Sequence, residues 1–204
     1  DELAELDEVV QDGPGDPRVA IVGGSYGGAL ALMAAGADPR VDSVVAMVTW
    51  NDLADAFFPQ HAERHPSAAL DGLDSIGRPG PFKQLWASTF FAGTAVADGA
   101  PGAVPPTGEG PALCGRFDPA LCELFLAAAE TGEPVPELID LLRRNSPAPS
   151  LHEVRAPVYL VQGMNDTLFG LEHADATAHA LQSAGVPVAV RWFNGGHDGD
   201  APAA

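Results

Sequence analysis

The sequence predicts an α/β fold in which a mostly parallel sheet is flanked by helices and interrupted by a helical insertion. Four short apolar runs rich in β-branched residues, at 18–23, 41–49, 157–163 and 188–193, are typical of strands buried on both faces. The first two runs enclose a helix-forming stretch, which makes a strand–helix–strand unit with a right-handed crossover. Residues 51–154 lack such runs, so we expect a separate helical segment there.

The amino-terminal elements follow in order. Apolar residues recur at helical spacing over residues 1–10, which predicts the end of an amphipathic helix with one face formed by Leu3, Leu6, Val9 and Val10. Residues 11–17, QDGPGDP, are a turn cluster. After the first strand, a run of strong helix formers predicts a helix that ends near Gly36.

The helical segment 51–154 divides the chain into a discontinuous α/β core, 1–50 with 155–204, and an insertion that we interpret as a cap or lid. Three helices are expected in the cap, near 81–91, 117–130 and 135–145.

The strand–helix alternation resumes after the cap. Apolar or small residues recur at helical spacing over 171–184, which predicts a helix there. Gly185 is placed to end this helix. The last strand, 188–193, leads into the glycine-rich loop NGGHDGD.

The charge and hydropathy of the chain exclude several function classes. A formal net charge of −18 argues against nucleic acid as a partner, because such proteins need a basic surface to neutralise phosphates. An anionic membrane surface is disfavoured for the same reason. No apolar stretch approaches the ~20 residues that a membrane-spanning helix needs, so we expect no membrane insertion.

The pentapeptide Gly23-Gly24-Ser25-Tyr26-Gly27 has the pattern G-x-S-x-G between a predicted strand and a predicted helix. That context is typical of a nucleophile elbow, a strained turn that exposes the serine hydroxyl and needs small residues two positions before and after it. We predict Ser25 as nucleophile and the Tyr26 backbone N–H as an oxyanion donor at the helix N-terminus. The alternative is a tight glycine-rich turn, such as one that cradles a phosphate.

A serine nucleophile needs a base, and a histidine is the usual one. The candidates are His61, His65, His152, His173, His179 and His197. His173 and His179 are expected to face solvent from a helix, whereas His197 follows a predicted strand in a glycine-rich loop. Carboxyl ends of parallel strands share one edge of a sheet, so we predict His197 as the base. The alternative is a histidine in a surface loop.

The base in turn needs an acid that fixes its tautomer. Asp166 directly follows the strand over 157–163, at the same edge of the sheet, and the chain order Ser25, Asp166, His197 is that of α/β-hydrolases. Asp52, after the second strand, is the competing acid. As an alternative, Asp166 forms a turn or begins the next helix.

Aromatic and polar residues near these positions are candidates for the substrate pocket, with packing or helix capping as the alternative: Trp50, Asn51, Asp52, Trp86 and Phe90. Cys114 and Cys122 are candidates for a disulfide, with two free buried thiols as the alternative. Two cysteines cannot build a structural zinc site unaided, and no other cluster has the spacing of metal ligands. We therefore expect no metal and no organic cofactor.

Three runs resemble the X-Pro dipeptidyl-peptidase and cocaine-esterase group of α/β-hydrolases, the acyl esterases similar to peptidase family S15. They are RVAIVGGSYGGALALMAAGADPRVDSVVAMVTWNDL, APVYLVQGMNDTLF and NGGHDGD. The resemblance covers roughly residues 15–60 and 150–200, and it implies the same nucleophile, acid and base.

The chain departs from that group in its strand count. Members have about eight strands with the elbow after the fifth, whereas this sequence predicts four strands and places the elbow after the first. The resemblance thus implies a partial α/β-hydrolase fold, with an upstream segment of the same chain that supplies the second oxyanion donor. The strand before Ser25 is then expected at an open edge of the sheet.

From the sequence we expect a serine hydrolase domain that acts on a small acyl ester, an amide or a short peptide. Two alternatives stay open: a non-catalytic binding module on the same scaffold, and an acyltransferase or thioesterase with the same triad. Location is undetermined, although the cysteine pair and the resemblance favour the exterior or cell envelope over the cytoplasm.

Overall fold

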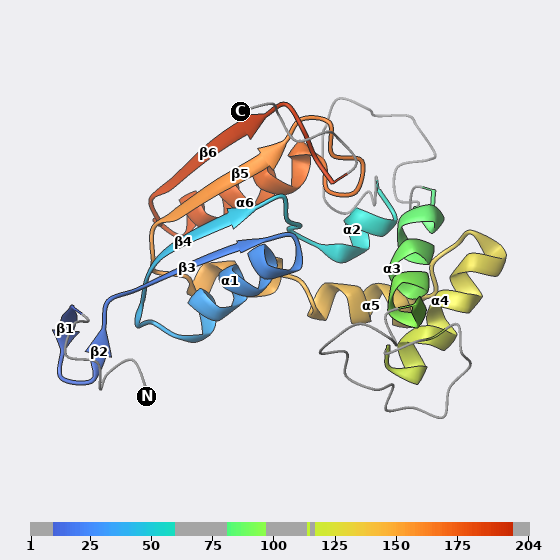
Figure 1. Cartoon of the computed structure of the whole chain (residues 1–204), viewed down its shortest axis with the longest axis horizontal. Helices are drawn as coiled ribbons and strands as arrows, with labels where there is room; N and C mark the ends of the chain where they lie inside the picture. Colours follow the sequence, from blue (N-terminus) through green and yellow to red (C-terminus); the bar gives the residue numbers. More distant parts are fainter. Residues whose placement is uncertain (1–9, 60–80, 97–113, 115–116, 198–204) are drawn as a thin grey trace. The chain divides into compact units, whose positions relative to one another are not determined.

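A computed structural model describes four parts of the chain: residues 10–59, 81–96, 114 and 117–197 (Figure 1). The predicted helix over residues 1–10 lies almost entirely outside the described residues.

The chain forms two compact units, residues 1–53 with 143–204, and residues 54–142. The first unit carries a parallel sheet and the second is helical. The second unit is shorter than the predicted insertion 51–154, because a 3-10 helix, η6 (Ala148–Glu153), packs against the two long helices of the first unit.

The sheet of the first unit has four parallel strands in the order β3-β4-β5-β6 (Figure 1). They are β3 (Val19–Gly24), β4 (Val41–Met47), β5 (Val158–Gly163) and β6 (Val188–Phe193). The sequence predicted all four within two residues of their ends, and it predicted β3 at an edge. The parallel register aligns the carboxyl ends of the strands, which puts the loops after them at one edge of the sheet.

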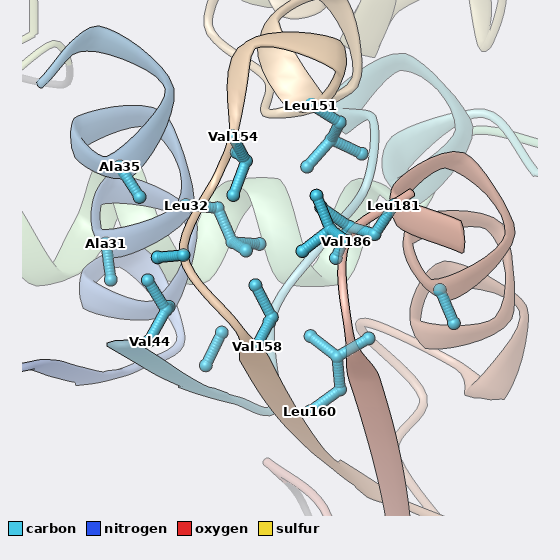
Figure 2. Packing of buried hydrophobic residues seen from close by; sticks show 13 residues of the cluster. Ala31, Leu32, Ala35, Val44, Leu151, Val154, Val158, Leu160, Leu181 and Val186 are labelled. Carbon is cyan, nitrogen blue, oxygen red and sulfur yellow. The ribbon is translucent and has the colours of Figure 1, made fainter. Parts of the chain in front are cut away.

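One face of the sheet is covered by two helices, α1 (Tyr26–Ala37) and α6 (Leu171–Ser183), together with η6. Figure 2 shows Leu32 of α1 and Leu181 of α6 in one core with Val44, Val158 and Leu160 of the strands. Each of these five side chains is almost fully removed from water. The end of α6 is found close to the predicted place, since Ala184 caps the helix and Gly185 follows it with a left-handed φ of 78°.

The prediction that the strands are buried on both faces is wrong for β3 and β6. Val22 is 62% exposed, and it aligns with Val45 and with the partly exposed Tyr159 on one face of the sheet. The physical reason is that α1 and α6 both pack on the opposite face, which carries Ile21, Val44 and Val158. Apolar composition alone does not tell which face of a strand a helix covers.

The turn cluster 11–17 contains a small antiparallel hairpin, with β1 (Gln11–Gly13) and β2 (Asp16–Pro17) joined through Gly15 at φ 75°. The sequence predicted the turn and missed the two short strands.

The second unit contains helices at the three places where the sequence predicts them. Its elements are α2 (Leu53–Phe57), which begins at the end of the first unit, α3 (Gln84–Val96), α4 (Pro119–Thr131) and α5 (Pro136–Arg144), which ends in the first unit. The start of α4 follows from its sequence, because Asp118 accepts a hydrogen bond from the Ala120 N–H and Pro119 occupies the first turn.

A disulfide joins Cys114 to Cys122 in the second unit, with Cα atoms 5.6 Å apart. Both cysteines are buried in an aromatic core with Phe91 and Phe125, whose rings stack at 4.0 Å between centroids. The bond therefore ties residue 114 to the first turn of α4 within this aromatic core.

Candidate active site

Ser25 lies at the junction of β3 and α1 in a backbone conformation that L-residues rarely adopt, with φ 52° and ψ −120°. Its N–H donates a hydrogen bond of 2.8 Å to the Met47 carbonyl of the neighbouring strand. Its own carbonyl accepts from the N–H groups of Gly28 and Ala29 in the first turn of α1, at 3.0 and 3.2 Å. A non-glycine residue at positive φ persists only where its surroundings hold it, and such strain is concentrated at functional sites.

Two glycines, Gly23 and Gly28, make this junction possible, whereas Gly27 differs from the prediction. A Cβ on Gly23 would lie 2.1 Å from the Gly27 carbonyl oxygen, so position 23 must be small, as predicted. A Cβ on Gly27 would meet nothing within 4 Å, which contradicts the expectation for that position. Gly28 is the second crowded glycine, because its Cβ would lie 2.9 Å from Thr49 Cβ. The backbone at 27 approaches Gly23, while its side-chain position points into open space.

The structure brings Ser25, His197 and Asp166 into one hydrogen-bonded row. Ser25 Oγ lies 2.8 Å from His197 Nε2, and His197 Nδ1 lies 2.7 Å from Asp166 Oδ2. The Asp166 side chain is fully buried and the His197 side chain is 17% exposed. Ser25 is half-buried, so the serine end of the row is more accessible than the Asp166 end.

Asp166 is held so that only one oxygen faces the histidine. Its Oδ1 accepts hydrogen bonds from the N–H groups of Leu168 and Phe169, at 3.0 and 2.8 Å. Its Oδ2 is left for His197 Nδ1, which must then carry its proton there. With the proton on Nδ1, the remaining ring nitrogen, Nε2, can accept from the Ser25 hydroxyl, which lies 2.8 Å away.

The loops after β5 and β6 touch through glycines. A Cβ on Gly196 would lie 2.5 Å from Asp166 Cα, and a Cβ on Gly163 would lie 2.3 Å from the Gly195 carbonyl oxygen. The Asn165 N–H also donates to that carbonyl at 3.0 Å. This close approach sets the spacing between acid and base. Sequence reasoning missed the contact between these glycines, although their position at the end of β5 and shortly after β6 was a usable signal.

An aromatic row lies beside these side chains. The Phe169 ring meets the His197 ring edge-on at 5.2 Å, and Trp50 lies 5.1 Å from Phe169. Tyr26 lies 6.2 Å from Trp50 and is largely exposed. The pocket candidate Trp50 therefore contacts Phe169, which in turn contacts His197. Sequence reasoning did not identify Phe169.

Val48, like Ser25, has a strained backbone conformation with positive φ. It is the residue after β4, next to Ser25 in register, and the two are the non-glycine residues with positive φ in the described parts of the chain. Its φ of 43° ends the strand, while its N–H donates to the Val161 carbonyl at 2.7 Å. The next residue, Thr49, then donates its hydroxyl to the Ser25 carbonyl at 2.8 Å.

We expect Thr49→Val to lower kcat by about tenfold and the free energy of unfolding by about 1 kcal/mol. The substitution keeps the side-chain shape against Gly28 and removes the donor to the Ser25 carbonyl. Thr49→Ser keeps the donor and is the matched control. Steady-state kinetics with denaturant unfolding measures both effects, and equal kcat for the two variants would contradict the role given to the hydroxyl.

Asn51 and Asp52 are engaged in the packing of the first unit. Asn51 donates through Nδ2 to Thr177 Oγ1 of α6 at 3.1 Å, and its backbone N–H donates to His173 Nδ1 at 3.3 Å. The buried Asp52 carboxylate lies 3.7 Å from the Arg143 guanidinium. The competing acid is therefore paired with an arginine, whereas Asp166 is paired with a histidine.

The other predicted residues are distributed as follows. Trp86 and Phe90 lie on α3 in the second unit, with ring centroids 6.2 Å apart. His173 is only 2% exposed, so the prediction that it faces solvent is wrong, because the face of α6 that carries it packs against Asn51 and Phe169. His179 is exposed as predicted. His61 and His65 lie outside the described residues.

Two further observations concern only the parts of the chain that the structure describes. Within those ranges, no grouping of three or more His, Cys, Asp or Glu side chains is placed to hold a metal ion. No helix in the same ranges has the length and hydropathy to cross a membrane.

Comparison with solved structures supports the fold. The acylaminoacyl peptidase of Pyrococcus horikoshii superposes with a TM-score of 0.50 at 16% identity, over 89% of this chain and 20% of the peptidase. Acetyl xylan esterase 1 from a Thermoanaerobacterium species gives 0.50 at 16% identity, over 94% of this chain and 44% of the esterase. This chain thus spans a fifth to less than half of the length of these proteins.

Sequence comparison with protein families assigns the chain to one of them. No curated protein matches the chain. A sequence model described as the alpha/beta hydrolase family matches residues 1–204. With the parallel sheet and the strand–serine–helix junction, this match shows that the chain belongs to the alpha/beta hydrolase family.

Proposed function

We propose that the chain is a serine hydrolase that cleaves an acyl ester, an amide or a peptide bond through an acyl-enzyme intermediate. The observation that carries the proposal is the row from Ser25 Oγ to His197 at 2.8 Å and from His197 to Asp166 at 2.7 Å. It supplies a nucleophile, a base in reach of the hydroxyl proton, and an acid that fixes the tautomer of the base.

In the first half-reaction, Ser25 Oγ attacks the carbonyl carbon of the substrate while His197 Nε2 takes the hydroxyl proton. The positive charge on the imidazole is stabilised by Asp166 Oδ2, and the carbonyl oxygen becomes an oxyanion. The Tyr26 N–H is the first backbone donor of α1 and lies at the positive end of the helix, where it can stabilise that oxyanion. His197 then returns the proton to the leaving alcohol or amine.

In the second half-reaction, water replaces the leaving group. His197 Nε2 takes a proton from water, the hydroxide attacks the acyl carbon, and the bond to Ser25 Oγ breaks as the proton passes to the serine. The products are a carboxylic acid and free enzyme, so the atoms balance with water as the only further reactant. An alcohol or amine in place of water would make the same site an acyltransferase.

Labelling with a fluorophosphonate probe tests the proposal. We expect a single phosphonylated serine, Ser25, and we expect Ser25→Ala and His197→Ala each to abolish labelling. The experiment uses the natural chain that contains residues 1–204 with any flanking sequence. A folded chain that does not react would favour the non-catalytic binding module instead.

The resemblance to the X-Pro dipeptidyl-peptidase and cocaine-esterase group supports a finer form of the proposal. Acyl esters and X-Pro amides are the two substrate classes that it implies, with Trp50 of the first unit as a candidate for the pocket wall. A parallel assay of short-chain acyl esters and X-Pro arylamides separates them, because only the peptidase reaction depends on a free amino terminus in the substrate.

A further inference from the structure

We infer that Gln162 is a positioning residue for the acid and the base, acting through Phe169; this inference rests on the proposed serine hydrolase function. Gln162 lies one residue before the end of β5 and is 2% exposed. A side-chain amide in the interior of a sheet is costly unless its groups are hydrogen-bonded. The hydrogen-bond partner of this amide therefore indicates its role in the fold.

The loop between β5 and α6, residues 164–170, carries Asp166 and is called the acid loop here. The amide of Gln162 fixes the backbone near the end of this loop. Its Nε2 donates a hydrogen bond of 2.6 Å to the Phe169 carbonyl oxygen, seven residues further along the chain. Both residues are buried, so water cannot replace this donor if it is removed. The bond joins the loop to a strand in the centre of the sheet, since β5 lies between β4 and β6.

The backbone that Gln162 fixes also orients the acid. The N–H of Phe169 and the N–H of Leu168 both donate to Asp166 Oδ1. With Oδ1 occupied in this way, Oδ2 is the oxygen that faces His197 Nδ1 at 2.7 Å. A shift of the peptide planes at 168 and 169 would rotate the carboxylate and lengthen this hydrogen bond.

The side chain of Phe169 contacts the base directly. Its ring meets the His197 ring edge-on, with 5.2 Å between centroids and 87° between planes. The Trp50 ring also contacts the Phe169 ring, with 5.1 Å between centroids. Phe169 thus touches the acid through its backbone and the base through its ring, and Gln162 is the buried group that holds its carbonyl.

A purely structural role for Gln162 makes a different prediction. In that case its loss lowers stability, but the folded fraction turns over substrate at the normal rate. A positioning role predicts that kcat falls in the folded protein while KM is nearly unchanged, because the acid–base pair acts in the chemical step rather than in ground-state binding.

Gln162→Met tests this difference, because methionine has a similar length and no donor. Thr177→Val is the matched control, since it removes another buried hydrogen bond, to Asn51, without touching the acid loop. We expect Gln162→Met to lower kcat by roughly 10- to 100-fold with KM within about twofold of wild type. We expect Thr177→Val to lower Tm comparably and to keep kcat within about twofold.

Proton NMR gives a readout that folding alone does not move. The His197 Nδ1 proton shared with Asp166 should give a low-field resonance in wild type and in Thr177→Val, and Gln162→Met should shift or broaden it. If Gln162→Met does not fold, Phe169→Leu replaces it, because leucine keeps the backbone bonds to Asp166 and removes the ring against His197. A kcat loss of roughly tenfold is expected there as well.

The outcomes separate the two proposals. Wild-type kcat and an unchanged low-field resonance in folded Gln162→Met would overturn the positioning role and leave the hydrolase intact. A wild-type chain with no reactivity at Ser25 would overturn the proposed function itself.

Discussion

Asp166→Asn is expected to lower kcat by about 10⁴-fold, which is about 5 kcal/mol of transition-state stabilisation. The asparagine fills the same space, and its Oδ1 still accepts from the N–H groups of Leu168 and Phe169. Its Nδ2 then faces His197 Nδ1 as a donor. The histidine must accept there and carry its proton on Nε2, where it can no longer take the proton of Ser25.

Asp52→Asn is the matched comparison, because Asp52 follows β4 and is the acid that the sequence offers in competition with Asp166. It is paired with Arg143 at 3.7 Å, so we expect a loss of stability and a change in kcat of less than about tenfold. Steady-state kinetics on the two purified variants measures both effects. A larger kcat loss for Asp52→Asn than for Asp166→Asn would reverse the assignment of the acid.

Gly23→Ala is expected to destabilise the first unit by about 3 kcal/mol or more and to abolish activity. The added Cβ would lie 2.1 Å from the Gly27 carbonyl oxygen, and a backbone atom cannot rotate away as a side chain can. Relief requires the start of α1 to move away from β3, which displaces Ser25 from His197.

Gly27→Ala is the control for that prediction, since it adds the same methyl group on the other side of the same contact. Its Cβ would meet nothing within 4 Å, and alanine is favoured over glycine in a helix by up to about 1 kcal/mol. We expect stability equal to wild type or higher. Denaturant unfolding measures the pair, and equal losses for both variants would contradict the packing described for the junction.

The proximity of Ser25, Asp166 and His197 could be predicted because it depends on local pattern and topology. Ser25, Asp166 and His197 each follow a strand, and parallel strands bring their carboxyl ends to one edge. The pattern of apolar runs is enough to locate those ends within two residues. The same reasoning placed β3 at an edge of the sheet, because strands in chain order become neighbours in space.

The supporting contacts could not be predicted because they depend on packing between distant segments. Nothing in the local sequence of Gln162 indicates that its amide meets the Phe169 carbonyl, or that His173 is covered by the residues after β4. The exposed face at Val22 has a similar origin. A β-branched run predicts a strand, but the placement of α1 and α6 on one face follows from the whole topology.

Mass spectrometry of the chain quenched in acid during turnover of an activated acyl ester tests the proposed reaction most sharply. If Ser25 is the nucleophile, the intact mass rises by one acyl group, peptide mapping places that group on Ser25, and the adduct disappears as the ester is exhausted. Ser25→Ala should show neither adduct nor turnover. Hydrolysis that continues in Ser25→Ala, or an acyl group on another residue, would contradict the role assigned to the Ser25, His197 and Asp166 row.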